Sequence, residues 1–308
     1  MAPIEIGLVG YQNPDSILNR ASRGFGDALK ARPGDEVAFR LTPDITRHGH
    51  KQFERPALVV SGEFAMMYQS TSYFTHSGAP DFGVLDLPYR FASHGHAHRA
   101  LDGELGVRLA RAASEGPPFR VLGFWDNGFR HLSNAQHPIR TPEDCRGLRI
   151  RTLTSPLHGE VFEALGMRPE VMDIATLLDR AKAGTIDAQD NPLTNIFGFG
   201  IQALQPHITM TGHIWGGSTL VVNRAVFDGW PPHVRTAVRE AAEVATSVQR
   251  TLAAEEDERI LASTEARDVE IVALTEAERL RFARAVQPVV DRHRHDYADL
   301  LRLISAAA

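Results

Sequence analysis

Two arginines, Arg130 and Arg151, stand where a strand is predicted to end and a turn or helix to begin. Arg151 closes the alternating stretch GLRIR, and Arg130 closes FWDNGFR, after a predicted strand and glycine-containing turns. Open α/β sheets bind their ligands at the edge where such strands end. Each guanidinium can donate two parallel hydrogen bonds to a carboxylate. The pair therefore predicts a site for an organic anion; the alternative is that each arginine is an ordinary surface residue.

Histidines are the other residues whose spacing could support chemistry. They occur two residues apart in three places: His48 and His50, His94, His96 and His98, and His293 and His295. This spacing puts side chains on one face only in a strand, whereas the middle group lies where a helix is predicted to begin. Because no carboxylate with a ligand-like spacing stands nearby, we expect surface or capping histidines, with a metal site as the alternative. No metal ligand is assigned.

The patterns of common hydrolases and dinucleotide enzymes are incomplete in this chain. Cys145 lies in TPEDCRG without a glycine-flanked nucleophile turn, and neither G-x-S-x-G nor H-E-x-x-H occurs. The Gly-Phe-Gly stretches at 24–26 and 198–200 lack the full context of a dinucleotide loop, so packing or turn glycines are expected there. We predict no catalytic residue and no cofactor.

The size and charge of the chain limit its partners. With 308 residues it is longer than a typical single core, which favours two lobes. A formal charge of −5 argues against nucleic acid or an anionic membrane surface as the main partner. The single cysteine excludes an internal disulfide, and no apolar run is long enough to span a bilayer. The start, MAPIEIG, lacks the parts of a secretory signal, so we expect a cytoplasmic protein or an exported one whose signal was removed.

Residues 147–193 form the clearest structural unit. The alternation in GLRIRT predicts a strand with one apolar face. Helices are predicted from Pro156 to about Gly166 and from Asp173 to about Gly184, each with a capping residue before it and a glycine after it. The unit is therefore expected to read strand–helix–strand–helix–strand, the crossover of a parallel sheet.

The rest of the chain shows the hydrophobic periods of strands, two residues, and of helices, about 3.6 residues. Strands are expected at 4–8, 37–41, 63–68, 84–89, 119–125, 208–213, 218–223 and 269–274, and helices at 15–31, 96–113, 231–265 and from 276 onward. The helix over 231–265 has no internal glycine or proline and would be about 50 Å long. Because a small lobe is narrower than this, we expect that helix to bridge two lobes.

A series of motifs runs in a fixed order from about Pro80 to His213. The motifs are PDFGVLDLPYRF, HAHRALDG, RVLGFWDNGFRHLSN, RTPEDCRGLRIRT, FEALGMRP, DAQDNPL and MTGH. Together they resemble the solute-binding proteins of tripartite ATP-independent periplasmic (TRAP) transporters, the DctP type. The set is highly specific, whereas the N-terminal third matches more loosely. The resemblance implies an α/β protein with a two-lobed, periplasmic-binding-protein-like fold, joined by hinge strands and braced by the long helix.

The same resemblance implies the limits of the lobes. Lobe I is expected to comprise residues 1–126 and 214–253, and lobe II residues 127–213 and 254–308. A protein of this kind closes on its ligand by a hinge motion between the lobes.

The resemblance also implies which residues hold the ligand. Arg151 corresponds to the carboxylate-binding arginine of the family, and Arg130 to the arginine of its NG-x-R stretch. Asn191 corresponds to the asparagine of the family's ENPL motif, with Asp190 in place of the usual Glu. Further pocket positions, from an alignment without gaps or from their place near strand ends, are Tyr68, Thr71, Ile174 and Trp215.

The expected function is capture of a small organic carboxylate by a periplasmic monomer that delivers it to a TRAP membrane permease. In sialic-acid-binding relatives the positions of Tyr68, Thr71 and Ile174 look like a carboxylate, an arginine and an aromatic. We therefore expect a monocarboxylate with an apolar or aromatic body instead of a sugar acid. The alternative is a soluble α/β enzyme acting on a carboxylate, with His131 or His213 as its base. A sensor built on the same fold is a third interpretation.

Overall fold

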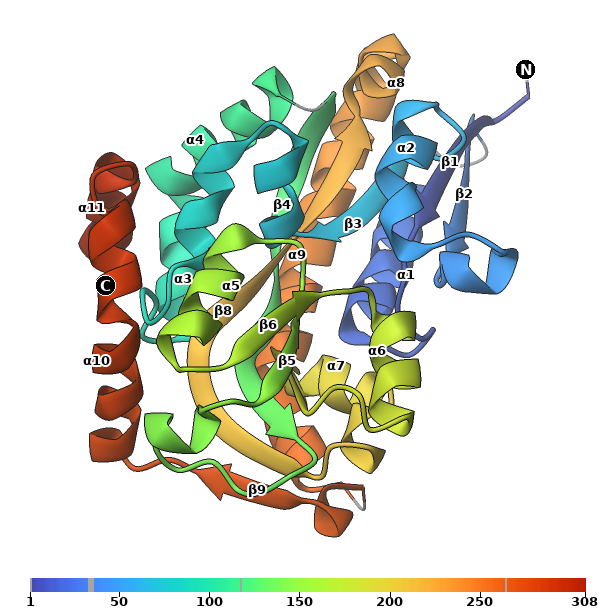
Figure 1. Ribbon diagram of the computed structural model, residues 1–308. Coiled ribbons are helices and arrows are strands. Elements are labelled where there is room, and N and C mark those ends of the chain that lie inside the picture. The colour runs from blue at the N-terminus through green and yellow to red at the C-terminus, as the bar shows by residue number, and fades with distance from the viewer. Residues whose placement is uncertain (1, 33–35, 117, 264) are drawn as a thin grey trace.

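One mixed β-sheet organises the part of the chain that the structure, a computed structural model, describes: residues 2–32, 36–116, 118–263 and 265–308 (Figure 1). Its strands are β1 (Ile4–Val9), β2 (Val37–Thr42), β3 (Met66–Ser70), β4 (Phe119–Asn134), β5 (Arg149–Thr152), β6 (Arg168–Val171), β7 (Ala188–Pro192), β8 (His207–Asn223) and β9 (Glu270–Ala273). They follow the order β2-β1-β3-β8-β4-β7-β5-β6, and β9 pairs with β8.

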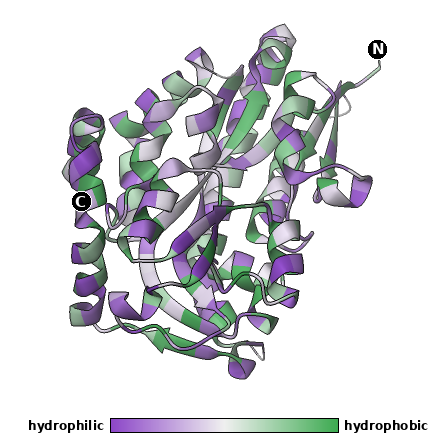
Figure 2. Cartoon of the chain, viewed as in Figure 1, coloured by the Kyte–Doolittle hydropathy of each residue, from purple (hydrophilic) through white to green (hydrophobic). Residues whose placement is uncertain are grey.

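Helices pack around this sheet. They are α1 (Ile17–Lys30), α2 (Arg55–Val60), α3 (His94–Asp102), α4 (Glu104–Glu115), α5 (Pro156–Ala164), α6 (Ile174–Lys182), α7 (Leu193–Gly198), α8 (Arg224–Gly229), α9 (Pro232–Leu261), α10 (Glu276–His293) and α11 (Ala298–Ala306). Short 3-10 turns that matter for the site are η3 (Gln52–Glu54), η4 (Thr71–Tyr73) and η6 (Pro80–Asp86). Figure 2 shows α10 alternating between apolar and polar residues, as a helix with one buried face does. None of the described helices combines the length and the apolar composition that crossing a membrane requires.

Two long antiparallel strands, β4 and β8, join the two ends of the sheet. At one end β8 pairs with β3, and at the other it pairs with β9 while β4 pairs with β7. The pairing of β4 with β8 shifts register between Asp126 and Phe129, and Gly128 adopts a φ of 92°. A residue inserted in a strand bends it and increases its twist. The two ends of the sheet therefore meet at an irregular segment, residues 126–129, as expected for hinge strands.

The helix α9 is buried against both ends of the molecule. Val234 and Ala245 lie in a core shared with α1 and β1, whereas Ile260 lies in a core shared with α6 and α7. Its 30 residues correspond to about 45 Å at the helical rise. This packing confirms the predicted long helix that bridges the two parts of the fold.

Two predicted elements differ from the structure. Residues 84–89 do not form a strand: Val84 to Asp86 belong to η6, and Tyr89 has a φ of 57°, which a strand excludes. The periodicity of a short buried apolar run is compatible with a helix and with a strand, so the sequence alone could not distinguish the two for residues 84–89. The helix predicted over 96–113 is two helices, because Gly103 ends α3 and begins α4.

The stretch 208–223, predicted as two strands, is the single strand β8. Gly216 and Gly217 do not form a turn within it. A Cβ at Gly216 would lie 2.5 Å from the carbonyl oxygen of Gly128, and one at Gly217 would lie 2.4 Å from the ring of Trp215. The two glycines thus allow close packing of neighbouring groups inside a continuous strand.

Candidate functional site

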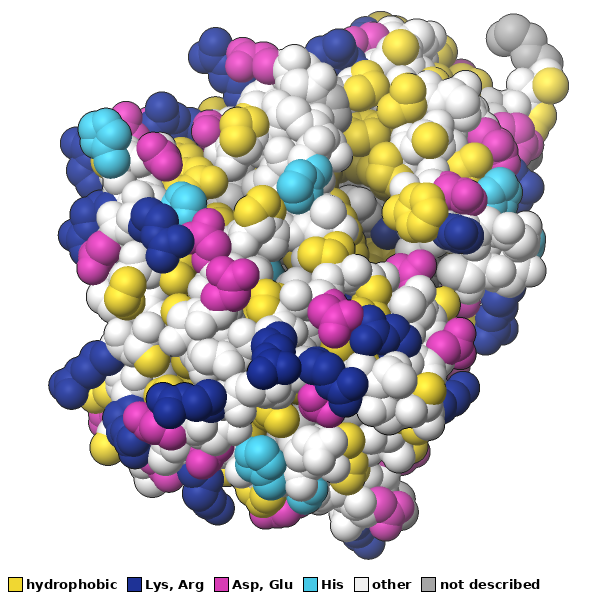
Figure 3. Space-filling model, in the orientation of Figure 1, with side chains coloured by type: hydrophobic (Ala, Val, Ile, Leu, Met, Phe, Trp, Pro, Cys, Tyr) yellow, Lys and Arg dark blue, Asp and Glu magenta, His cyan; other side chains and the backbone are white. Residues whose placement is uncertain are grey.

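A cavity of about 30 Å³ lies where the two ends of the sheet meet. Figure 3 shows a hollow in the middle of the face seen, below the part that covers α2. The residues of the cavity come from both ends of the molecule; they are Tyr11, Gln52, Ser70, Tyr73, Asn127, Arg130, Arg151, Leu153, Ile174, Asn191, Asn195, Phe199, Gly216 and Gly217. The fold thus brings Arg130, Arg151, Asn191 and Ile174 to one place.

Arg130 follows the irregular segment of β4 and is 4% exposed. Its Nε lies 2.5 Å from Oδ2 of Asp190, and its Nη2 donates to the Asp190 backbone carbonyl at 2.6 Å. Burial disfavours the charge of this guanidinium, but the Asp190 carboxylate outweighs burial and raises the pKa of Arg130. Nη1 makes no hydrogen bond to the described residues, so one nitrogen of Arg130 is left to face the cavity.

Arg151 lies near the end of β5 and is 2% exposed. Its Nε donates to the backbone carbonyl of Met172 at 2.8 Å. Neither Nη atom has a hydrogen-bond acceptor or a carboxylate partner among the described residues. Burial lowers the pKa of Arg151, because an enclosed charge without a counter-ion is costly. Arg151 is therefore a buried cation that still lacks an anion.

Asn191 belongs to a chain of side-chain amides. Its Nδ2 donates to Oε1 of Gln189 at 2.5 Å, and its Oδ1 accepts from Nδ2 of Asn195 at 3.1 Å. Oδ1 of Asn195 in turn accepts from Nε2 of Gln12 at 2.8 Å. These bonds fix the orientation of Asn191 and leave it one amide hydrogen and one lone pair for a further partner. They also tie β7 and α7 to the loop after β1.

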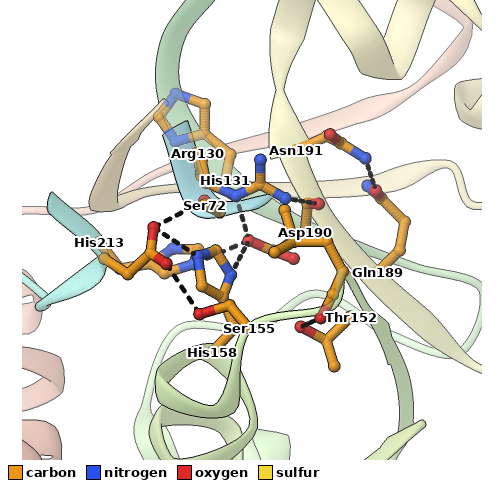
Figure 4. A network of polar contacts seen from close by, with 12 residues as sticks. Ser72, Arg130, His131, Thr152, Ser155, His158, Gln189, Asp190, Asn191 and His213 are labelled. Atoms are coloured by element: carbon orange, nitrogen blue, oxygen red, sulfur yellow. Dashed lines mark hydrogen bonds and ion pairs between the residues drawn. The ribbon is translucent and has the colours of Figure 1, made fainter. Parts of the chain in front are cut away.

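Asp190 is the centre of a buried polar network behind Arg130 (Figure 4). Besides Arg130, its Oδ2 lies 3.4 Å from Nε2 of His213 and 3.7 Å from Nδ1 of His158. Burial favours the neutral acid, but Arg130 and the two histidines outweigh burial and hold the pKa of Asp190 well below its usual range. Asp190 is thus a carboxylate at neutral pH and anchors Arg130 by a buried ion pair.

Tyr68, Thr71 and Trp215, three of the predicted pocket residues, lie one layer behind the lining of this cavity. The hydroxyl of Tyr68 accepts hydrogen bonds from two backbone N–H groups of the loop after β1. Thr71 donates to the carbonyl of Gly217 at 3.2 Å, and Trp215 packs against Phe91 with ring centres 5.6 Å apart. These three side chains are not among the residues that line this cavity, and Tyr68 and Thr71 are engaged in hydrogen bonds within the protein. Their role in ligand binding stays a prediction.

The histidines considered as metal ligands or bases make contacts within the protein. His94 Nδ1 and His98 Nε2 lie 2.7 and 2.8 Å from Oδ2 of Asp126. Among the residues described, no group of three or more His, Cys, Asp or Glu side chains is arranged to hold a metal ion. Burial lowers the pKa of His131 to about 3, which makes it a weak base at neutral pH. Neither His131 nor His213 lines the cavity.

Most of the neutral side chains of the lining were not predicted from the sequence. Tyr11 follows β1 and Ser70 ends β3, so both stand at the carboxyl ends of parallel strands, where the edge rule could have found them. Asn127 lies in the irregular segment of β4, and Phe199 follows α7. Those two carry no local signal, because a bulge and a contact between distant segments leave no periodic pattern.

Comparison with known proteins connects this architecture to one family of sequences. The model of the bacterial extracellular solute-binding proteins, family 7, matches residues 10–296. The chain is 33% identical over 268 residues, 86% of its length and 79% of the relative's, to the 2,3-diketo-L-gulonate-binding periplasmic protein of Escherichia coli. It is 31% identical over 290 residues, 94% of its length and 86% of the relative's, to the C4-dicarboxylate-binding periplasmic protein of Rhodobacter capsulatus.

Solved structures share the fold over the whole chain. The sugar acid binding protein of Advenella mimigardefordensis in complex with galactonate superposes with a TM-score of 0.93, at 22% identity and with 100% of both chains covered. A TRAP periplasmic solute binding protein from Ralstonia eutropha with bound (S)-2-acetolactate gives a TM-score of 0.89, at 25% identity and with 98% of both chains covered. The arrangement of strands and helices described above is therefore that of these binding proteins.

Proposed function

This chain belongs to family 7 of the bacterial extracellular solute-binding proteins, and from that membership we propose that it captures a small organic carboxylate and delivers it to a TRAP-type membrane permease. The family consists of the solute-binding components of transporters. We place the protein in the periplasm, as a monomer that releases its ligand unchanged. The cavity supports binding without turnover, because the two histidines considered as bases lie outside its lining.

The observation that carries this proposal is the buried, unpaired charge of Arg151 among the described residues. Arg151 is a buried guanidinium with no anionic partner among the described residues, and it lines the cavity. A buried charge without a partner is costly, and a carboxylate that accepts two parallel hydrogen bonds is the partner that suits a guanidinium best. The ligand carboxylate is therefore proposed to bind Arg151, with Nη1 of Arg130 and the amide of Asn191 as further donors.

The charges of the lining favour a single carboxylate. Arg130 and Arg151 are the cations of the cavity, and Asp190 already balances Arg130. One positive charge is thus left for the ligand, and a second carboxylate would be buried without a counter-ion. The proposed ligand is accordingly a monocarboxylate.

The neutral side chains indicate the body of the ligand. Leu153, Ile174 and Phe199 offer an apolar wall, as expected for an apolar or aromatic body. Asn127, in contrast, has a buried Oδ1 that accepts no hydrogen bond from the described residues. A ligand hydroxyl or amine would satisfy that oxygen, whereas an all-carbon body would leave it unpaired. We therefore propose a monocarboxylate with one apolar face and at least one hydrogen-bond donor.

The volume of the cavity implies a closed conformation. About 30 Å³ is room for a water molecule or two, whereas sites for small ligands usually measure about 300 Å³ or more. The ligand must therefore enter an opened cleft. The proposed moving parts are residues 1–126 with 214–253 and residues 127–213 with 254–308, turning about the irregular segment of β4.

A thermal-shift panel followed by calorimetry tests the proposal. The panel comprises pantoate, 2-acetolactate, galactonate, D-glucuronate, succinate and phenyllactate, with glucose and glycerol as uncharged controls. We expect pantoate, 2-acetolactate or phenyllactate, which have one carboxylate and an apolar face, to raise the unfolding temperature more than the sugar acids do. A ligand at a hundredfold above its dissociation constant adds about 2.7 kcal/mol of stability. Mass spectrometry of the recovered ligand should find it unchanged.

Different results contradict different parts of the proposal. Chemical conversion of the bound acid would indicate an enzyme. Stabilisation by succinate alone would leave the transport role standing and remove the monocarboxylate assignment. Equal binding by wild type and Arg151→Ala would contradict the site itself.

A further inference from the structure

His158 lies beside Asp190 in the buried polar network that contains Arg130 (Figure 4), and the buried carboxylate of Asp86 is its other neighbour. It stands in the first turn of α5, with its side chain fully buried. Its Nε2 is 3.3 Å from Oδ1 of Asp86, and its Nδ1 is 3.7 Å from Oδ2 of Asp190. Asp86 ends η6 and Asp190 lies on β7, so the imidazole connects segments that are far apart in the chain.

Both carboxylates are held as hydrogen-bond acceptors. Asp86 accepts from the hydroxyl of Ser72 at 2.6 Å and from that of Ser155 at 2.7 Å. Ser155 precedes α5, yet its side chain bonds Asp86 and does not cap the helix. Asp190 is already committed to Arg130. Neither ring nitrogen of His158 has a hydrogen-bond partner among the described residues, so its contacts with Asp86 and Asp190 are ion-pair contacts. A neutral imidazole compensates neither carboxylate, whereas an imidazolium attracts both.

The buried charges balance only if His158 carries a proton. Asp86 and Asp190 supply two negative charges, and Arg130 supplies one positive charge. An imidazolium at His158 makes this network neutral, so that Arg151 and a ligand carboxylate balance each other in the cavity. With a neutral His158 the network beside the cavity has an excess negative charge, which repels an anionic ligand.

We propose that His158 is a positioning residue for ligand binding, which as an imidazolium between Asp86 and Asp190 makes the network around Arg130 neutral and leaves Arg151 to balance the ligand carboxylate. This inference rests on the function proposed above and adds a property to it. Because the imidazolium favours the anionic ligand, the ligand must equally favour the imidazolium, and the protein retains or takes up a proton on binding.

The electrostatics of the surrounding groups agree with this assignment. Burial opposes the charge of His158, but Asp86 and then Asp190 outweigh burial and raise the pKa of His158. Burial lowers the pKa of the neighbouring His213 on β8, so His213 is neutral where His158 is charged. Other charged or titratable groups near these elements are Arg130 on β4, Glu160 on the outer side of α5 with Arg292 and His293 of α10, and Tyr297 before α11.

The sign of the pH dependence follows from these directions. Below the raised pKa of His158 the imidazolium is present with or without ligand, and the affinity is constant. Above that pKa the free protein loses its proton, which the ligand must restore, so the affinity falls as the pH rises. Each pKa unit that the ligand adds to His158 corresponds to a tenfold fall in affinity over the titration. An ordinary ligand carboxylate titrates near pH 4, well below this range.

Calorimetry from pH 5.5 to 9.5 tests the proposal, with the tighter binder of pantoate and phenyllactate as probe. We expect wild-type affinity to fall about tenfold or more toward pH 9.5. His158→Gln should bind about tenfold more weakly at pH 6 and show a flat profile. Asp86→Asn removes the stronger of the two carboxylate influences, so the midpoint of the pH profile should move to lower pH. His131→Gln is the matched control: His131 is also buried, is neutral across this range, and should leave the profile unchanged.

A second variant and an NMR titration test the same proposal if the single variant does not fold. If His158→Gln fails to fold, the double variant Asp86→Asn/His158→Gln removes a charge of each sign together and should fold and bind with a flat profile. In ¹³C-labelled protein the His158 signal, assigned by its absence in that variant, should titrate above an exposed histidine and shift to higher pH with probe. A His158 pKa at or below that of an exposed histidine, or the same pH profile in variants without the imidazole, overturns the inference. Failure of every acid to bind wild type contradicts the proposed function instead.

Discussion

Arg130 and Arg151 reach the same cavity in different electrostatic states. Asp190 neutralises Arg130 and holds two of its three nitrogens, whereas Arg151 has only a backbone carbonyl as a partner among the described residues. A guanidinium that is already paired serves mainly to orient a ligand, while an unpaired one contributes most of the attraction. At the residue scale we therefore expect Arg151 to contribute most of the binding free energy.

Replacement of Arg151 should abolish tight binding without unfolding the protein. Arg151→Ala is expected to cost about 3–5 kcal/mol of binding free energy, because the ligand carboxylate loses its main partner. Arg151→Lys should also bind poorly, since a point charge cannot reproduce the planar fork. Calorimetry with a panel acid measures both variants, and Arg168→Ala, an exposed arginine of the adjacent strand β6, is the control that should bind normally. Wild-type affinity in Arg151→Lys would refute the bidentate contact.

The single cysteine offers a prediction on pH. Burial raises the pKa of the Cys145 thiol to about 12, and the side chain is 0% exposed. The reactive thiolate is therefore scarce at pH 8 in the folded protein but not in the unfolded chain, whose thiol titrates near 8.5. Since the folded pKa is the higher one, stability from this group is lost as the pH rises above about 8.5.

Alkylation measures that difference directly. Iodoacetamide at pH 8, followed by mass spectrometry, should leave the native protein unmodified and add one group in urea. Rapid alkylation of the native protein would show that residue 145 is accessible or that its thiol is ionised.

At the scale of elements, two glycines of α1 give a matched pair. Gly24 and Gly26 both lie in the helix, in the Gly-Phe-Gly stretch that resembled part of a dinucleotide loop. A Cβ at Gly24 meets nothing within 4 Å, whereas one at Gly26 would lie 2.3 Å from the ring of Phe39. Gly24 therefore only lowers the helix propensity of α1, whereas Gly26 allows α1 to lie close to β2.

Alanine substitutions should separate these two roles. Gly24→Ala is expected to stabilise the protein by about 0.5–1 kcal/mol, because alanine restricts the unfolded chain and favours the helix. Gly26→Ala should destabilise it by about 1–3 kcal/mol, since Phe39 must move. Urea unfolding monitored by circular dichroism compares them, and equal effects in the two variants would contradict the packing described for α1 and β2.

At the scale of the whole molecule, the small cavity and the helix α9 together predict the motion. A ligand cannot enter about 30 Å³, and α9 is buried in cores at both ends of the molecule. We therefore propose that opening bends β4 near residues 126–129 and β8 near the paired residues 215–217. Hinge closure of this kind changes the overall dimensions more than the secondary structure.

Small-angle scattering can follow that motion. We expect the radius of gyration to decrease when a panel acid saturates the protein, with an unchanged far-UV circular dichroism spectrum. Arg151→Ala, mixed with the same acid, should keep the larger radius of the free protein. Identical scattering of wild type with and without saturating ligand would exclude closure.

The sequence by itself determined the local parts of this protein. Asp173 caps α6, and Gly166 and Gly184 adopt the left-handed conformation after their helices, as their positions predicted. Strand alternation placed Arg151 near the end of β5. These features depend on neighbours within a few residues, which is why periodicity and capping residues reveal them. The motifs added the family and the expectation of two lobes.

Only the tertiary structure decided which side chains meet. In the structure Asn127 lines the cavity, whereas Tyr68, Thr71 and Trp215 are not among its lining residues. It also paired Arg130 with Asp190, from strands that are adjacent only in the folded sheet. The imidazole of His158 between Asp86 and Asp190 is a contact of three distant segments. No local pattern encodes such contacts, because they arise from the packing of a whole sheet whose register and bends are set by many residues at once.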